Sequence, residues 1–180
     1  MMITLVLGGI RSGKSRWAEQ QFADDLIGSS VYIATSLASD DEMAQRIDHH
    51  QRQRNGRFTT HELNFTEECL AEVLAGYAHL QQPILLECMS TWLGWWLSTD
   101  KSPQLQLVDI HRQSSLLLEA LKQIDSDIVI VSNEVGLGLV SDNAVARMFA
   151  DELGRLNQAL ATIADRVVFI SAGLPLILKE

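Results

Sequence analysis

The stretch best suited to chemistry is a glycine-rich run near the start of the chain, Gly8–Ser15, which reads G-x-x-x-x-G-K-S. It follows the apolar run Ile3–Leu7 and precedes helix-compatible residues, the order typical of a phosphate-binding loop. In such a loop the N–H groups turn toward a polyphosphate, and the helix start adds partial positive charge. Gly8 and Gly13 allow backbone angles closed to other residues. We therefore predict nucleotide binding; the alternative is a turn that binds nothing.

Two side chains of this loop and one later carboxylate could handle phosphate and metal. Lys14 supplies a positive charge for the β- and γ-phosphates, and the Ser15 hydroxyl is placed to bind Mg²⁺. Glu87 ends the run Ile84-Leu85-Leu86-Glu87, which resembles a Walker B strand, although such strands usually end in Asp. We predict that Glu87 helps to hold Mg²⁺; the alternative is a strand-end carboxylate that faces solvent.

Short apolar runs and longer amphipathic segments alternate along the chain. Nearly continuous apolar runs predict strands that are covered on both faces, and alternation with helices predicts a mainly parallel sheet flanked by helices. We expect one α/β domain of the phosphate-loop NTPase type over residues 1–180. The predicted strands are Ile3–Leu7, Val31–Thr35, Ile84–Cys88, Ile128–Ser132 and Val167–Ser171, with a further short one over Phe58–Glu62, and the predicted helices are Leu105–Ile124 and Ala144–Ala164.

In such sheets ligands bind beyond the carboxyl ends of the strands. Polar residues directly after the apolar runs therefore become site candidates: Thr35-Ser36, Glu87, Asn133-Glu134 and Ser171. Glu134 could act as a general base toward an acceptor hydroxyl. It could equally cap a helix or pair with an arginine, and the sequence leaves these roles open.

A histidine pair lies on a helix predicted to begin at the capping box Ser39–Glu42. His50 shares the apolar face of that helix, whereas His49 lies on a polar face with Arg46. A neutral imidazole is available as a nucleophile near neutral pH. From spacing alone, a solvent-exposed pair is the simpler interpretation.

Three tryptophans, Trp92, Trp95 and Trp96, form an apolar patch on another predicted helix. Such a patch favours core packing or a subunit interface over a ligand platform.

Bulk composition narrows the function classes. The formal net charge is −9, so the chain lacks the basic surplus of a general nucleic-acid binder. Because the first predicted strand begins at Ile3, we expect no signal peptide, and no apolar run is long enough to span a bilayer. Cys69 and Cys88 lack metal-ligand spacing. We expect a reduced, cytoplasmic protein without nucleic-acid partner or membrane span.

Several motifs in order closely resemble the bifunctional adenosylcobinamide kinase / adenosylcobinamide-phosphate guanylyltransferase family of cobalamin biosynthesis. The resemblance runs from the first strand to the last few residues. It rests on Gly8–Ser15, Tyr32-Ile33-Ala34-Thr35-Ser36, Asp41-Glu42-Met43, Arg46-Ile47-Asp48-His49-His50, Leu85-Leu86-Glu87-Cys88, Ser132-Asn133-Glu134-Val135-Gly136 and Gly173-Leu174-Pro175.

The resemblance implies two reactions. ATP or GTP phosphorylates the hydroxyl of adenosylcobinamide; GTP then loads GMP onto a histidine, matched here by His49, and the GMP passes to the phosphorylated corrinoid. It also implies Mg²⁺, a homotrimer, and nucleotide contacts from Gly8, Gly9, Ile10, Arg11, Ser12, Gly13, Lys14, Ser15, Ala34, Thr35, Ser36, His50, Gln51, Arg52, Gln53, Glu62 and Glu87.

Two departures from the family pattern stand out. Ile10 replaces a smaller residue, which the loop tolerates if the side chain points away from the phosphates. Gly94-Trp95-Trp96 replaces a more polar stretch, which puts substrate contact by that helix in question. Two rival functions remain: a small-metabolite kinase without guanylyl transfer, and a non-catalytic nucleotide-binding regulator.

Overall fold

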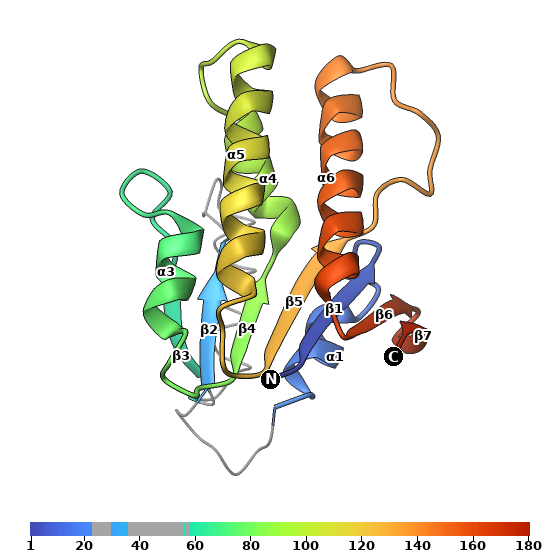
Figure 1. The fold of residues 1–180 in the computed structure, drawn as a ribbon. Coiled ribbons are helices and arrows are strands. Elements are labelled where there is room, and N and C mark those ends of the chain that lie inside the picture. Colours follow the sequence, from blue (N-terminus) through green and yellow to red (C-terminus); the bar gives the residue numbers. More distant parts are fainter. Residues whose placement is uncertain (23–29, 36–55, 57) are drawn as a thin grey trace.

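The computed structural model describes residues 1–22, 30–35, 56 and 58–180. Within these residues the chain forms one mainly parallel sheet with strand order β3-β2-β4-β5-β1-β6-β7, in which only β7 is antiparallel to its neighbour (Figure 1). β1 therefore lies between β5 and β6. The strands are β1 Ile3–Gly8, β2 Ser30–Ala34, β3 Phe58–Glu62, β4 Ile84–Glu87, β5 Ile128–Asn133, β6 Arg166–Ser171 and β7 Leu174–Lys179.

Helices cover both faces of the sheet. α1 packs on one face against β1, β4, β5 and β6, while the other described helices stand on the opposite face, in front of the sheet in Figure 1. Among the described residues, no helix has both the length and the hydropathy needed to cross a bilayer. The helices are α1 Lys14–Glu19, α3 Leu70–Tyr77, α4 Met89–Leu97, α5 Pro103–Leu121 and α6 Ala144–Ile163.

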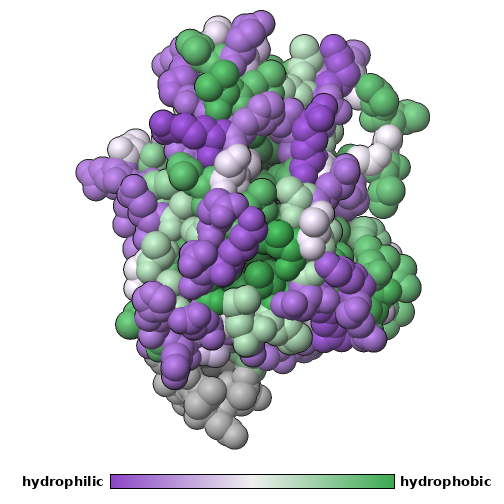
Figure 2. Space-filling view, viewed as in Figure 1, coloured by the Kyte–Doolittle hydropathy of each residue, from purple (hydrophilic) through white to green (hydrophobic). Residues whose placement is uncertain are grey.

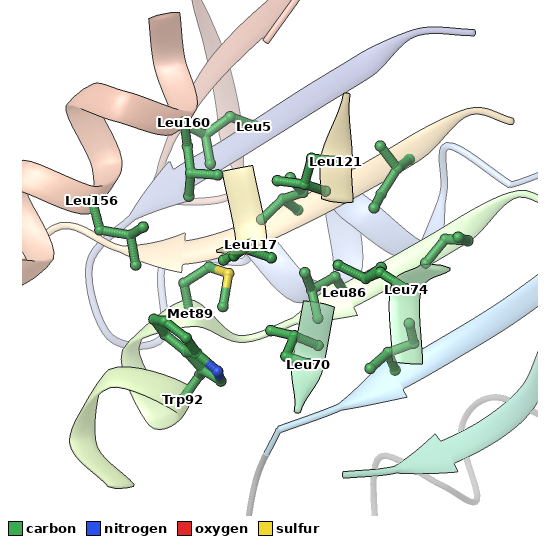
Figure 3. Close-up of a cluster of buried hydrophobic side chains, with 14 of the residues drawn as sticks. Leu5, Leu70, Leu74, Leu86, Met89, Trp92, Leu117, Leu121, Leu156 and Leu160 are labelled. Atoms are coloured by element: carbon green, nitrogen blue, oxygen red, sulfur yellow. The ribbon is translucent and has the colours of Figure 1, made fainter. Parts of the chain in front are cut away.

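Strand pleating divides the core between these two faces. Along β1, Leu5 and Leu7 point toward the larger helix layer, while Val6 points toward α1. Figure 3 shows the larger cluster, where Leu86 of β4 and Met89 and Trp92 of α4 meet side chains of α3, α5 and α6. Because both faces are covered, the strands read as continuous apolar runs.

The predicted elements are confirmed within a few residues, including the short strand over Phe58–Glu62. Cys88, predicted as the last residue of a strand, lies past the end of β4 and is the N-cap of α4. The sequence did not predict α3 or the antiparallel strand β7. The predicted helix that begins at Ser39 lies outside the described residues.

The tryptophans of α4 are packing residues. Trp92 is 1% exposed and belongs to the core, which excludes it from a surface patch. Trp95 stacks on Phe65, and the rings of Trp92 and Trp96 meet edge to face at 6.5 Å. Core packing, one of the two predicted roles, therefore applies to this face of α4.

Candidate active site

The loop Gly8–Ser15 joins β1 to α1 at the carboxyl edge of the sheet. Its left-handed positions are Arg11 (φ 56°) and Gly13 (φ 97°). The prediction that Gly8 supplies such an angle was wrong, because Gly8 belongs to β1. Gly8 is needed instead for space: a Cβ there would lie 2.6 Å from the Ile170 carbonyl oxygen. Ile10 is 79% exposed, so its extra bulk extends into solvent.

A turn near the C-terminus packs against this loop and stabilises it. Ala172 and Gly173 both have positive φ and join β6 to β7 in a two-residue hairpin. The Gly173 N–H donates to the Ser12 carbonyl at 2.8 Å, and a Cβ on Gly13 would lie 3.1 Å from the Gly173 Cα. The end of the chain therefore fixes the shape of the loop near its start, a contact that the sequence did not predict.

The Lys14 ammonium lies within the loop and donates to the Gly9 carbonyl at 3.2 Å. Burial lowers the pKa of Lys14 below the ordinary lysine value, and the nearby Cys88 and Glu87 partly oppose that shift. A cation that has lost part of its hydration interacts strongly with an incoming anion.

Ser15, Glu87 and Tyr32 form one hydrogen-bonded group. The Ser15 hydroxyl donates to Glu87 Oε1, and the Tyr32 hydroxyl donates to Glu87 Oε2 at 2.9 Å. The Glu87 carboxylate therefore faces the loop, and the alternative of a strand-end group directed only to solvent is wrong. Tyr32 was missed, although a tyrosine within a buried strand requires a partner for its hydroxyl.

Beneath this group, a chain of polar side chains connects β2, α4 and β5. The Thr35 hydroxyl lies 2.9 Å from that of Thr91 and donates to the Cys88 carbonyl at 2.6 Å. The Cys88 thiol lies 2.9 Å from the Ser90 hydroxyl, which accepts from Asn133 Nδ2 at 2.7 Å. These bonds fix the N-terminus of α4 against the edge of the sheet.

Register explains why distant residues meet here. Ala34 pairs with Glu62 on β3 and with Glu87 on β4, so the three predicted nucleotide contacts lie side by side. Gly8 pairs with Asn133 of β5, and the Glu134 N–H donates to the Gly8 carbonyl at 3.0 Å. Ser36, His49, His50, Gln51, Arg52 and Gln53 lie outside the described residues.

Glu134 stabilises its own loop. Its Oε1 accepts from the Gly136 N–H at 2.5 Å. The N-cap of α6 is Asn143, whose side chain accepts from Val145 and Ala146, so Glu134 does not cap that helix. A role as general base stays a prediction.

This geometry, a glycine loop followed by lysine and serine against a strand-end carboxylate, is typical of enzymes that handle nucleoside triphosphates. Residues 4–178 match the model of the cobinamide kinase / cobinamide phosphate guanyltransferase family. The chain belongs to this family.

Full-length relatives agree with that assignment. The chain is 40% identical over 178 residues to the bifunctional adenosylcobalamin biosynthesis protein CobP of Pseudomonas aeruginosa, covering 99% of this chain and 98% of the relative. It is 37% identical over 186 residues to the protein CobU of the same description from Escherichia coli, covering 99% of this chain and all of the relative. The predicted class, a bifunctional kinase and guanyltransferase of cobalamin biosynthesis, is confirmed for this member of the cobinamide kinase family.

More distant structures agree on the fold. The P4 protein of bacteriophage phi6, in complex with ADP, superposes with a TM-score of 0.51 at 15% identity, covering 97% of this chain and 52% of that one. A solved ATPase domain superposes with a TM-score of 0.52 at 14% identity, covering 93% of this chain and 68% of that one. The predicted phosphate-loop NTPase fold is confirmed for this cobinamide kinase family member.

Proposed function

We propose that this chain carries out both family reactions at the edge of the sheet formed by the loop Gly8–Ser15 and Glu87. The observation that carries the proposal is the convergence of Lys14, Ser15 and Glu87 from two separate elements. A turn that bound nothing would have no need of a half-buried lysine beside a carboxylate and a hydroxyl.

In the kinase reaction, the hydroxyl oxygen of cobinamide attacks the γ-phosphorus of ATP or GTP. The bond to the β–γ bridging oxygen breaks, the nucleoside diphosphate leaves, and the hydroxyl proton passes to a base. Lys14 stabilises the charge that develops on the phosphoryl oxygens, and the loop N–H groups orient the phosphates.

The donor set fits Mg²⁺. The Ser15 hydroxyl and the Glu87 carboxylate are hard oxygen donors already in mutual contact, and Mg²⁺ is typically held by one or two protein oxygens with phosphate and water completing the shell. Bound there, Mg²⁺ would neutralise charge on the phosphate oxygens. Tyr32 keeps the second Glu87 oxygen in place.

In the guanylyl reaction, an imidazole nitrogen of His49 attacks the α-phosphorus of GTP and pyrophosphate leaves. A phosphate oxygen of cobinamide phosphate then attacks the same phosphorus, the P–N bond breaks, and the histidine is released. The assignment to His49 rests on its match to the family motif. Ala34 and Glu62, beside Glu87, are proposed to contact the nucleotide together with Ser36 and residues 50–53.

We also infer a homotrimer in the cytoplasm. β7 is exposed along its whole length at one edge of the sheet, with Leu174, Leu176 and Leu178 among its residues; Figure 2 shows apolar surface at its position. An apolar edge strand is a surface that soluble proteins usually cover. Light scattering should give three times the chain mass of 20.0 kDa, and Leu176→Arg should lower the measured mass.

The proposed cytoplasmic location agrees with two free cysteines, which are expected in a reducing compartment.

The test of the guanylyl step is incubation with Mg²⁺ and α-labelled GTP, followed by denaturation. We expect label that survives alkali, is lost in acid and is absent from His49→Ala, while much of the kinase activity remains. His79→Ala is the matched control, because His79 is an exposed histidine paired with Asp125 away from the loop.

Retained label in His49→Ala would contradict the assignment of the nucleophile. Absence of label in the wild type, with γ-phosphate still transferred to cobinamide, would leave a kinase alone. Absence of both reactions would favour a nucleotide-binding regulator.

A further inference from the structure

A large cavity lies beside the phosphate loop, apart from the nucleotide residues. It is open to solvent, has a volume of about 910 Å³, and is lined by the second half of α4, the loop that follows β5, and the first turns of α6. In Figure 1 this loop, residues 134–143, arches outward beside α6. The cavity is of the size of small-molecule sites.

One end of the cavity lies near the start of the phosphate loop. Its wall includes Val135 and Gly136, which directly follow Glu134, whose N–H donates to the Gly8 carbonyl at the start of the phosphate loop. An acceptor bound in the cavity would therefore have one end close to the loop that is proposed to hold the phosphates. Another described cavity, lined by Met2, Pro83 and Asp127, lies at the amino ends of the strands, on the wrong edge of the sheet.

The lining is mostly apolar and includes unusually exposed side chains. Leu139 is 102% exposed and Val140 is 85% exposed, and both line the cavity together with Leu97 and Phe149. Figure 2 shows apolar residues gathered where this loop lies in Figure 1. Exposed apolar side chains around a concave site are typical of ligand binding.

A few polar groups are placed among them. Arg147 donates to the Ser141 carbonyl at 2.8 Å, which ties α6 to the loop, and Asp151 lies one turn further along the helix. One cation and one anion make a poor site for a triphosphate. A mostly apolar lining with a few polar groups suits a ligand with broad apolar faces and neutral amide groups at its edge.

Different residues of α4 contact the core and line the cavity. Its tryptophans pack in or against the core, whereas Gly94 lines the cavity; Leu97 lines the cavity and also packs against the core. A Cβ on Gly94 would lie 4.0 Å from the Phe149 ring, so the absence of a side chain keeps this part of the cavity open. The departure Gly94-Trp95-Trp96 is thus compatible with substrate contact by α4.

We propose that this cavity binds the corrin ring of cobinamide and directs its hydroxyl, and later its phosphate, toward the nucleotide site. A corrin is a broad macrocycle with apolar faces and carboxamide arms, which matches the lining. The proposal rests on the proposed function and deepens it by assigning the acceptor site to the loop after β5 and the adjoining faces of α4 and α6.

The test compares two cavity variants with matched controls. Gly94→Leu fills the cavity while improving helix propensity, and Gly154→Leu, at a helical glycine with open space around it, is its control. Leu139→Ser removes an exposed wall residue, and Leu116→Ser, exposed on α5, is its control. Binding is measured by equilibrium dialysis with cobinamide, read by corrinoid absorbance, and kinase KM by initial rates.

We expect both cavity variants to raise the cobinamide Kd and KM about tenfold or more, because Gly94→Leu occupies space that the ligand needs and Leu139→Ser removes an apolar contact. The yield of GTP-derived label on the enzyme should match the wild type, because that step needs no corrinoid. Both controls should leave all values unchanged.

Unchanged cobinamide Kd and KM in both cavity variants would overturn the proposal while the proposed function stands. A lower oligomer mass for Leu139→Ser with unchanged KM would also overturn it, by identifying the loop as a subunit contact. Failure of the wild type to bind cobinamide would overturn the proposed function as well. Loss of GTP-derived label in a cavity variant would show that the substitution damages the nucleotide site and not the acceptor site alone.

Discussion

The Ser15 hydroxyl donates a hydrogen bond to the Glu87 carboxylate, although the two residues are 72 positions apart in the chain. Ser15 lies in the first turn of α1, after β1, and Glu87 ends β4, two strands away from β1 in the sheet. The parallel arrangement places both at the same edge. This contact joins the phosphate loop to the carboxylate that we propose binds the same Mg²⁺ ion as Ser15.

Glu87→Gln should lower the kinase rate at least about tenfold and raise the Mg²⁺ concentration needed for half-maximal rate, because the neutral amide loses the charge that attracts the cation. Tyr32→Phe should have a smaller effect of the same kind, since it only frees one Glu87 oxygen. Rates measured across a Mg²⁺ titration check both, with Glu119→Gln as an exposed helical control. An unchanged Mg²⁺ midpoint in Glu87→Gln would count against the metal role.

Nucleotide affinity should fall as the pH rises through the lowered pKa of Lys14. Only protonated Lys14 carries the charge that phosphate needs, and burial shifts its loss of charge below the ordinary lysine range. Bound triphosphate favours the charged form, so binding at alkaline pH should take up a proton. Calorimetry in buffers of different ionisation enthalpy measures this uptake. Proton uptake that persists in Lys14→Met would assign it to another group.

Gly13→Ala should destabilise the fold by about 1–3 kcal/mol, because alanine is strained in a left-handed conformation. The new methyl group would also press on Gly173, whose Cα lies 3.1 Å from the Cβ position. Gly9→Ala is the control for folding, since nothing lies within 4 Å of its Cβ position. Urea unfolding of the two variants gives the comparison. Equal stability of Gly13→Ala and Gly9→Ala would mean that the C-terminal hairpin moves to accept the methyl group without loss of stability.

Trp92→Ala should destabilise the fold by about 3–5 kcal/mol, the usual cost of deleting a buried aromatic side chain. Trp92 is 1% exposed and packs with Met89 and Leu117 in the main core (Figure 3). Trp92→Phe, which keeps much of the volume, should cost less. The free energy of unfolding in urea checks both. A loss for Trp92→Ala below about 1 kcal/mol, the size of a typical surface effect, would contradict its place in the core.

Local pattern was sufficient for much of this protein. The motif Gly8–Ser15 between an apolar run and a helix predicted the phosphate loop, and continuous apolar runs predicted buried strands. Even Phe58–Glu62, with little alternation to guide it, was assigned correctly as a strand. These features depend on neighbours in the chain, which a sequence displays directly.

Several contacts at the site depend on segments that are far apart in the chain. Nothing beside Gly8 in sequence reveals the Ile170 carbonyl that excludes a side chain there, and nothing near Ser12 reveals the hairpin at Gly173 that braces it. The partnership of Tyr32 with Glu87 and the cavity beside Gly94 likewise depend on strand order and helix placement. Residue types and spacing identified which groups could do chemistry. Only the sheet register determined which of them meet, because contacts between distant segments arise from packing that no short stretch encodes.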